Sequence, residues 1–183
     1  ERWLAFSFEY EHRGHEAFIT SFPSPGRARS VVRGLPRYDD QIDLAWSADG
    51  RLALELGSYD SVSWGHIATV ARNGRRLRLV TRSTRDRTPD WSPTGRRIVF
   101  ARERPPSLGI TRFGSDVFVA RAGSRIHHAP RRLTYTGDAF APVWSPNGRY
   151  IAYLDIPDFL GSIFSSGSLR IMRATDGQGQ RLV

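Results

Sequence analysis

A few side chains in this sequence are of the types that hydrolytic chemistry requires. Ser61, Ser63 and His66 lie close together in the chain, so a hydroxyl nucleophile and an imidazole base could meet there. No acid or oxyanion donor is placed beside them, and the sequence contains neither a Gly-x-Ser-x-Gly elbow nor a glycine-rich phosphate loop. We therefore expect these residues to form an ordinary loop, and we expect no catalytic residue in this chain.

The histidines give little support for a metal site. His12 and His15 lie in one predicted loop, and His127 is followed directly by His128 in another. Neither pair is accompanied by carboxylates at a spacing that would complete a zinc or iron site. The chain also contains no cysteine, which excludes disulfides, thiolate zinc sites and iron-sulfur clusters. The sequence therefore predicts no metal and no cofactor.

The composition is that of a globular domain with an unusual source of charge. With 183 residues, of which 39% are hydrophobic, the chain is long enough for one sizeable core. It contains no apolar run near the roughly 20 residues that a membrane span needs, and no signal sequence at its start. The net charge is +9, and all 27 basic residues are arginines scattered along the chain. This scatter favours solvated surface charges, with binding to nucleic acid or an acidic surface as the less favoured alternative.

A short motif occurs three times and predicts how the chain is organised. It reads WSADGR at 46–51, WSPTGR at 91–96 and WSPNGR at 144–149, about 45 and 53 residues apart. Repeats of about 40 to 50 residues are typical of propeller blades, which are small sheets of four antiparallel strands. The structural repeat residues are Trp46, Gly50, Trp91, Pro93, Gly95, Trp144, Pro146 and Gly148.

The repeated motif has the chemistry of a tight hairpin turn. Proline fixes φ near −65°, and glycine readily takes the positive φ that closes such a turn. After the turn, the segment 98–101 alternates with apolar residues on both faces, as does 151–154. We therefore expect strands that are buried on both sides between neighbouring sheets, with each motif tryptophan packed between blades.

Further strands follow each copy of the motif. The expected third strands are 66–71, 116–121 and 169–174, and the expected fourth strands are 77–81, 131–134 and 180–183. The N-terminal segments 3–8, 16–22 and 28–32 fit the same frame without a first strand. We therefore predict an all-β chain that forms a β-propeller, or a fragment of one, from four-stranded antiparallel blades. The blades are expected at approximately 1–34, 41–82, 87–134 and 140–183, and the first of them is incomplete.

The best copies of the repeat resemble a known family. The segment PDWSPTGRRIVF at 89–100, followed by DVFV at 116–119 and RRLT at 131–134, is similar to the repeat of TolB-type β-propellers. The same repeat is found in the propeller domains of prolyl-oligopeptidase-type enzymes. The copy at Trp46 departs from it, with Ala48 in place of proline. The resemblance implies a bacterial, periplasmic or otherwise extracytoplasmic location, a protein partner, and a larger propeller of six or more blades.

First strands of a propeller line a central channel, which raises one further metal hypothesis. Asp43 and Asp90 lie near aligned positions of two first strands, where paired carboxylates could attract a cation such as Ca²⁺. The third copy offers Ala141 and Val143 at the corresponding positions. A water-filled polar channel without a bound ion is therefore the simpler expectation.

The connections between strands differ between the two ends of the predicted blades. At one end the turns are short and repetitive, whereas the segments 10–15, 57–65, 103–115 and 155–167 at the other end are long and unlike one another. Variable loops on a repeated scaffold commonly carry recognition. The candidate partner-binding residues are Tyr59, Asp60, Trp64, Arg85, Arg87, Arg112, Phe113, Asp138, Phe140, Asp158 and Phe159.

These observations leave two main functional hypotheses. The favoured one is a non-enzymatic recognition scaffold that binds a protein or peptide through its variable loops. The alternative is the substrate-gating propeller of a prolyl-oligopeptidase-type serine hydrolase whose catalytic domain is absent from this chain. In either case, unclosed propeller edges could lead the chain to associate with other strands.

Overall fold

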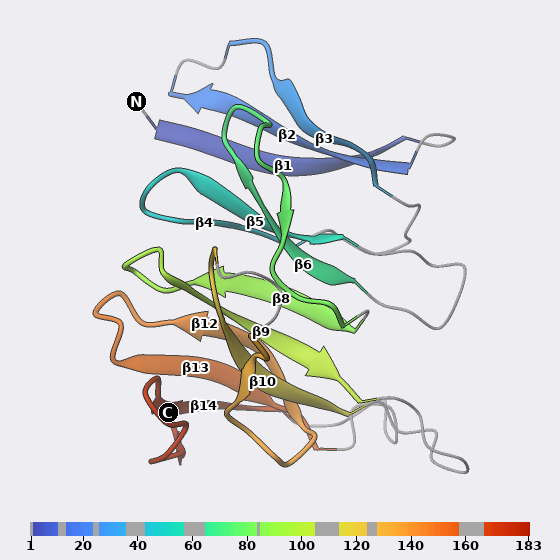
Figure 1. Cartoon of the computed structure of the whole chain (residues 1–183). Coiled ribbons are helices and arrows are strands. Elements are labelled where there is room, and N and C mark those ends of the chain that lie inside the picture. Colours follow the sequence, from blue (N-terminus) through green and yellow to red (C-terminus); the bar gives the residue numbers. More distant parts are fainter. Residues whose placement is uncertain are drawn as a thin grey trace.

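The chain folds into four antiparallel sheets stacked in sequence order. The computed structural model describes residues 2–10, 14–23, 26–35, 43–56, 65–83, 85–104, 114–123, 128–157 and 167–183. All regular elements in these residues are β-strands, and none of the described segments forms an apolar helix of membrane-spanning length. Figure 1 shows the stack from the N-terminal sheet to the C-terminal sheet.

Each sheet is a meander in which strands adjacent in sequence pair with one another. Sheet 1 contains β1 (Arg2–Tyr10), β2 (Gly14–Phe22) and β3 (Arg29–Leu35). Sheet 2 contains β4 (Leu44–Trp46), β5 (Arg51–Leu56), β6 (His66–Ala71) and β7 (Arg78–Leu79). Sheet 3 contains β8 (Asp86–Trp91), β9 (Arg97–Glu103), β10 (Ser115–Arg121) and β11 (Arg131–Arg132). Sheet 4 contains β12 (Ala139–Trp144), β13 (Tyr150–Asp155), β14 (Ser168–Arg173) and β15 (Arg181–Leu182).

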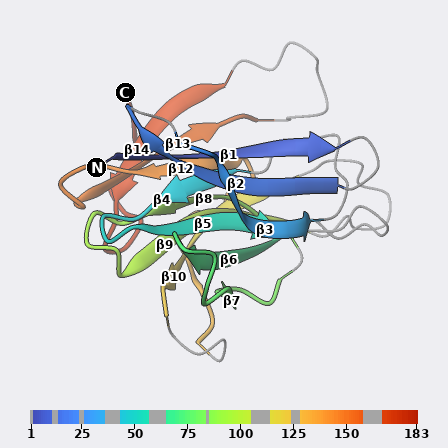
Figure 2. The same cartoon turned by 90° about the horizontal axis from the view of Figure 1, so that it is seen from above.

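The predicted all-β architecture of propeller blades is confirmed, including a first sheet of three strands. Apolar side chains fill the spaces between consecutive sheets, and in Figure 2 the strands of successive sheets lie over one another. Sheets 1 and 2 meet through Ala17, Ile19, Leu52, Leu54 and Val70. Sheets 2 and 3 meet through Ala53, Ile67, Trp91, Ile98 and Phe100. Sheets 3 and 4 meet through Val99, Val117, Trp144, Ile151 and Met172.

The repeated motif forms the turn that its residues predict. Gly95 has a φ of 65°, and its N–H donates to the Ser92 carbonyl at 2.8 Å. The Ser92 hydroxyl accepts the Arg97 N–H at 3.0 Å, so the serine closes the hairpin with its side chain. Ser47 and Ser145 make the same side-chain bond in the other two copies. The motif serine is therefore a part of the turn.

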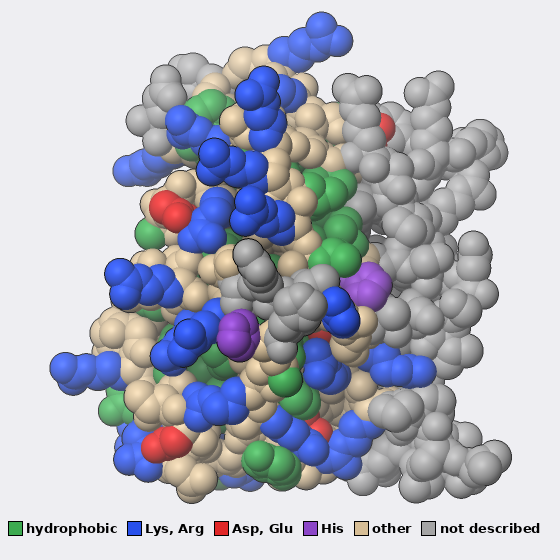
Figure 3. All heavy atoms as spheres, viewed as in Figure 1, with side chains coloured by type: hydrophobic (Ala, Val, Ile, Leu, Met, Phe, Trp, Pro, Cys, Tyr) green, Lys and Arg blue, Asp and Glu red, His purple; other side chains and the backbone are tan. Residues whose placement is uncertain are grey.

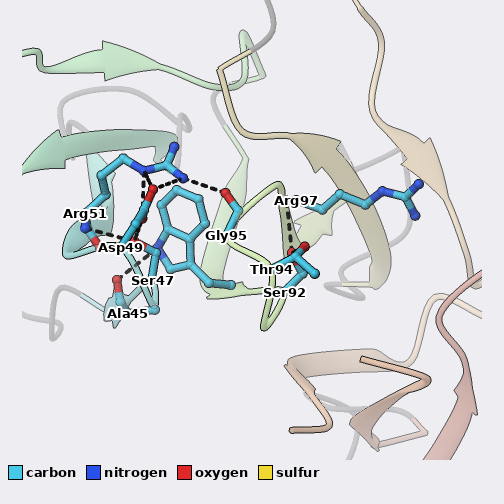
Figure 4. A network of polar contacts seen from close by, with 9 residues as sticks. Ala45, Ser47, Asp49, Arg51, Ser92, Thr94, Gly95 and Arg97 are labelled. Carbon is cyan, nitrogen blue, oxygen red and sulfur yellow. Dashed lines mark hydrogen bonds and ion pairs between the residues drawn. The ribbon is translucent and has the colours of Figure 1, made fainter. Parts of the chain in front are cut away.

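The motif tryptophans of the third and fourth sheets lie between blades, as predicted. Trp91 is 4% exposed, and its Nε1–H donates to the Ala45 carbonyl of sheet 2 at 3.1 Å. Figure 4 shows the surrounding network, in which Arg51 reaches across to the Gly95 carbonyl at 2.6 Å. Trp144 is buried in the contact between sheets 3 and 4. One turn thus joins its blade to the blade before it.

The outermost strands of sheets 2, 3 and 4 are shorter than the sequence predicts, whereas β3 of sheet 1 extends beyond the predicted 28–32. The segment 77–81 was expected to be a strand, but β7 ends at Leu79. The reason is that the Thr81 hydroxyl, rather than a strand carbonyl, accepts the Ile67 N–H at 3.0 Å. Thr134 does the same for the Val117 N–H at 2.9 Å. A threonine side chain therefore replaces a ladder bond and turns the chain toward the next blade.

The expected burial of both strand faces is wrong for one face of sheet 4. Leu154 on β13 is 40% exposed, although Ile151 and Tyr153 on the other face are buried. Sheet 4 packs on sheet 3 with one face, and no further described sheet covers the other. The apolar pattern of 151–154 is that of a strand between two sheets, but only one neighbour is present here.

Candidate functional site

The sheets have two ends of different character, which we call the turn end and the loop end. The turn end contains the glycine turns that join first to second and third to fourth strands. The loop end contains the last residues of β5, β9 and β13 and the first residues of β6, β10 and β14. Seven predicted candidates of the loop end lie outside the described residues and stay predictions: Tyr59, Asp60, Trp64, Arg112, Phe113, Asp158 and Phe159.

A buried carboxylate organises the loop end of sheet 3. Asp116, at the start of β10, is 1% exposed. Its Oδ2 accepts hydrogen bonds from Arg132 at 2.6 Å and from Arg104 at 3.0 Å. Its Oδ1 accepts from the Thr134 hydroxyl at 3.1 Å and the Gly137 N–H at 3.2 Å. Four donors on one carboxylate therefore fix the chain that follows β11 against β10.

An exposed aromatic ring lies on this buried network. Tyr135 is 70% exposed, and the Arg132 guanidinium lies 4.5 Å from the centre of its ring. Arg104 donates to the Tyr135 carbonyl at 2.9 Å, and the Arg104 side chain is 45% exposed. We call Arg104, Arg132 and Tyr135 the Tyr135 cluster. It presents an aromatic face beside two guanidinium groups that share a single carboxylate, so its local charge is positive.

Arg87, one of the predicted candidates, lies in an ionic cluster between sheets 2 and 3. Its guanidinium is 3.2 Å from Glu103 Oε1 and 3.6 Å from Glu55 Oε1, and both carboxylates are largely buried. Burial raises the pKa of Glu55 to about 7, which the neighbouring Arg87 only partly opposes. Gly65 leaves the space for this side chain, because a Cβ there would be 2.2 Å from Glu55 Cγ.

Two more carboxylates of the loop end are paired with arginines. Asp86, which is fully buried, accepts from Arg102 Nε at 2.5 Å and Nη2 at 2.9 Å. Asp155 at the end of β13 forms an ion pair with Arg170 of β14. The buried acids of this end thus hold strands together, and each lies beside the base of a variable loop.

Arg85, Asp138 and Phe140 are the other candidates that the structure describes. The Arg85 carbonyl accepts the Glu103 N–H at 2.9 Å, and the Asp138 carbonyl accepts the Ile156 N–H at 2.8 Å. Asp138 also bridges to Ser115, next to Asp116, whereas Phe140 is half-buried on β12. The structure therefore brings Asp138 close to the Tyr135 cluster, and it brings Arg85 close to Glu103 in the ionic cluster around Arg87.

Sequence reasoning missed the Tyr135 cluster as a candidate site. The segments 116–119 and 131–134 were interpreted as architecture, and Tyr135 follows the second of them directly. The signal in the sequence was a bulky aromatic residue after the pair Leu133-Thr134, because the previous copy has Arg82 after Val80-Thr81. A motif that holds the blade together also carries exposed residues at its end.

Asp90, one of the two carboxylates considered for a cation site in the central channel, forms a hydrogen bond between sheets. Asp90 Oδ2 accepts the backbone N–H of Trp144 at 2.7 Å, so it joins sheet 3 to sheet 4. Burial raises the pKa of Asp90, and the same cause raises that of Asp43. Within the described residues, no three side chains of His, Asp or Glu come together as metal ligands would.

The turn end gathers the arginines that are scattered in the sequence. Figure 3, viewed as in Figure 1 with the turn end at the left, shows a side of the molecule on which basic side chains greatly outnumber acidic ones. Pockets at the boundaries between sheets are lined by Arg51, Arg72, Arg76 and Arg78 in one case and by Arg97, Arg121 and Arg131 in the other. Asp49 and Asp176 are the acids that the described turns of this end contain. Exposed arginines therefore occur at both ends, whereas the buried and paired acids described above lie at the loop end.

Known proteins are similar to this chain, one in the sequence of a segment and others in fold. No family model matches the chain. The Tol-Pal system protein TolB 1 of Novosphingobium aromaticivorans is 36% identical over 80 residues, which are 44% of this chain and 16% of that protein. A structure assigned as TolB from Agrobacterium tumefaciens aligns with a TM-score of 0.71 at 18% identity, over 98% of this chain and 60% of that one. A prolyl endopeptidase aligns with a TM-score of 0.62 at 13% identity, over 94% and 26%.

The chain spans less than two thirds of each of these proteins. The two solved structures share the fold of the four sheets that are described here. The resemblance to TolB-type β-propellers that the sequence motifs predicted is therefore confirmed, and the described sheets have the all-β fold of part of such a propeller.

Proposed function

We propose that this chain is a non-enzymatic recognition scaffold that binds a protein or peptide at its loop end. The observation that carries the proposal is the Tyr135 cluster, in which an exposed ring and two arginines rest on the buried Asp116. Tyrosine and arginine are enriched among the residues that dominate binding energy in protein interfaces. The buried carboxylate fixes both arginines before a partner arrives, which lowers the entropy lost on binding.

The charge of the cluster favours an acidic partner. Asp116 neutralises one of the two guanidinium groups, so a positive charge remains beside the Tyr135 ring. A carboxylate of a peptide could accept from the outer N–H groups of Arg104, while an apolar side chain covers the ring. The resemblance to TolB-type propellers implies an extracytoplasmic setting, where the partner would be another protein of that compartment.

Selection of peptides tests this proposal. Wild-type chain is presented to a library of displayed random peptides, and the binders are then measured by calorimetry against Tyr135→Ala. We expect acidic peptides, and a loss of affinity of about tenfold or more, or about 1.4 kcal/mol, for the variant. Tyr150→Ala is the control, because Tyr150 is an exposed tyrosine on β13 away from the cluster. Equal affinities for the two variants would contradict the proposal.

The likeness to a prolyl endopeptidase supports a second candidate, a propeller that gates access to a catalytic domain. This candidate predicts a hydrolase domain with a Gly-x-Ser-x-Gly elbow elsewhere in the same gene product. Sequencing the complete gene decides between the two, because such a domain would replace the recognition scaffold as the better account.

A further inference from the structure

Two pockets at the turn end collect arginine side chains. One lies between sheets 2 and 3 and has a volume of about 720 Å³, and the other lies between sheets 3 and 4 and has a volume of about 400 Å³. We call them the first and the second boundary pocket. Their arginines are Arg51, Arg72, Arg76 and Arg78 in the first pocket and Arg97, Arg121 and Arg131 in the second. Each pocket therefore combines a concave shape with several cations.

Strand pairing shows that the two pockets occupy equivalent places in consecutive sheets. The equivalent residues are Arg51 and Arg97 at the start of the second strand, Thr69 and Val119 on the third strand, and Arg78 and Arg131 on the fourth. The sheet that follows also contributes an equivalent residue to each pocket. This residue is Gly123 in the first pocket and Thr175 in the second, each two positions after the end of its third strand. The pocket is therefore a feature of the repeat.

The first boundary pocket has an excess of positive charge. Asp49 is the acid among its described lining residues, and its carboxylate pairs with the Arg51 guanidinium at 2.9 Å. The other three arginines, Arg72, Arg76 and Arg78, are exposed, and no acid among the described residues forms an ion pair with them. These three guanidinium groups therefore keep their charge available for an anion from outside the chain.

The second boundary pocket is also positively charged, because its described lining residues include no acid. Arg97 is exposed, and Figure 4 shows its side chain extending away from the turn that holds its backbone. Arg131 is exposed as well and donates to the Ala174 carbonyl at 3.4 Å, which is a neutral acceptor. The charge of both arginines is therefore not compensated within the part of the pocket that the structure describes.

The chemistry of both pockets fits densely charged phosphate groups. A guanidinium offers two parallel N–H donors, which match two oxygens of a phosphate. Among the lining residues that the structure describes, neither pocket contains Phe, Tyr or Trp, so no such ring is available to stack on a nucleobase or a sugar. Several cations in pockets of this size are best neutralised by an anion in which every unit is charged. These features favour a chain of phosphates over a nucleic acid or an acidic polysaccharide.

The repetition of the pocket favours a ligand that is itself repetitive. Sheets that pack face to face lie roughly 10 Å apart, so equivalent pockets of consecutive sheets are near neighbours. A phosphate held in one pocket brings the phosphates linked to it to a high local concentration at the other pocket. Two pockets that each bind a single phosphate weakly can therefore bind one chain of phosphates tightly.

We propose that the turn end binds inorganic polyphosphate, with phosphate groups of one polymer chain held in both boundary pockets. The arginines of the two pockets supply the N–H donors, and the polymer supplies the negative charge that the pockets lack. Binding releases counterions from the polymer, so the affinity should fall as the salt concentration rises. The site does not depend on the peptide site proposed above, which lies at the loop end.

Calorimetric titration of the full chain with long-chain polyphosphate tests this site. At about 0.15 M ionic strength, Arg78→Glu in the first pocket and Arg97→Glu in the second should each weaken binding about tenfold or more, because a carboxylate repels the phosphate. Arg149→Glu is the matched control, since Arg149 is exposed in the turn before β13 and lines neither pocket. It should change the affinity by less than about threefold, because a charge outside the pockets is largely screened. Equal losses for all three variants would overturn the proposal, since they would reflect net charge alone.

Inorganic triphosphate tests whether one chain of phosphates joins the two pockets. This short ion should occupy the pockets one at a time, so at equal phosphate concentration it should bind wild type about tenfold or more weakly than long-chain polyphosphate. Equal affinities for the short and the long ligand would contradict binding of one chain across both pockets.

Other polyanions test the class of ligand. Oligothymidylate and polygalacturonate, at matched charge and salt concentration, should bind about tenfold or more weakly than polyphosphate, because the pockets offer no ring for their bases or sugars. Binding of either polymer as tightly as polyphosphate would overturn the choice of a phosphate chain. Circular dichroism verifies folding, and Arg78→Gln and Arg97→Gln replace the glutamate variants if these do not fold.

Discussion

At the turn end, serine and glycine hydrogen bonds hold each hairpin locally and many arginines remain exposed, whereas at the loop end carboxylates are buried and paired with arginines. The partners of a turn lie within six positions of one another, but Asp116 binds groups between 12 and 21 positions away. Local geometry thus stabilises one end and long-range ionic contacts the other. The end that depends on long-range contacts is also the end with variable loops.

Removing one acid from each end tests most directly whether the two ends are stabilised in different ways. Asp116→Ala is expected to lower the free energy of unfolding by about 3–5 kcal/mol, because two arginines lose their shared buried carboxylate. Asp49→Ala at the turn end is expected to cost about 1 kcal/mol or less, since its ion pair with Arg51 is exposed. Urea unfolding of both variants measures the difference, and similar losses would show that the two ends do not differ in this respect.

Trp91→Ala tests whether the turn end also joins blades. The free energy of unfolding should fall by about 3 kcal/mol or more, because the ring is buried between sheets 2 and 3 and its Nε1–H donates to the Ala45 carbonyl. Trp91→Phe keeps much of the packing and removes the hydrogen bond, so a smaller loss of about 1 to 2 kcal/mol is expected. Thermal unfolding checks both values. A loss under about 1 kcal/mol for the alanine variant would place the ring outside the contact that stabilises the fold.

The buried carboxyl of Glu55 at the loop end should also make the free energy of unfolding depend on pH. The folded pKa of Glu55 is raised to about 7 from an ordinary value of 4.5, so the folded chain holds a proton between these values that the unfolded chain has released. The stabilisation linked to this proton is complete below pH 4.5 and is lost as pH rises through about 7. Glu55→Gln should therefore reduce the decline in unfolding free energy between pH 5 and 8, by on the order of 2 kcal/mol.

Urea unfolding at the two pH values, for wild type and Glu55→Gln, measures this difference. Burial also raises the pKa of Asp43, Asp90 and Glu103, and these groups remain in both proteins. The comparison between the two proteins therefore isolates Glu55. Parallel pH profiles would mean that Glu55 is ionised in the folded chain throughout this range.

The smallest change in the free energy of unfolding is expected when exposed arginines of the turn end are replaced. Arg78 and Arg97 are exposed, and among the described residues their guanidinium groups have no hydrogen bond or ion pair. Replacing both with Gln should change the unfolding free energy by less than about 0.5 kcal/mol. The same change should lower the salt concentration that elutes the chain from heparin, because fewer cations face the polyanion. Arg102→Gln, which breaks a buried pair, is the contrasting variant and should be strongly destabilised.

The sequence predicted the parts of the fold whose causes are local. The Trp-Ser-x-x-Gly turns depend on residues a few positions apart, and the strand His66–Ala71 was predicted with its observed bounds. The fourth strands of sheets 2 and 3 were predicted too long because Thr81 and Thr134 bond across to the third strand, which depends on how the chain is placed in three dimensions.

The candidate site depends on contacts that the sequence does not show, and partner binding at the loop end stays a prediction. Arg87, predicted as a partner-binding residue, lies between Glu55 and Glu103. The role of Asp116 depends on Arg104, Arg132 and Gly137, which come from three separate segments. Charge pairing of this kind has no period in the sequence, so only the folded chain reveals it.

The hydrogen bond from Trp91 to Ala45 illustrates how stability passes through the molecule. Each sheet has its extensive contacts with the sheets directly before and after it, so the energy of folding is shared mainly between neighbours. Among the described sheets, sheets 2 and 3 pack on a neighbour on both sides. Within this part of the molecule, a disturbance at one sheet therefore spreads through the contacts between consecutive sheets.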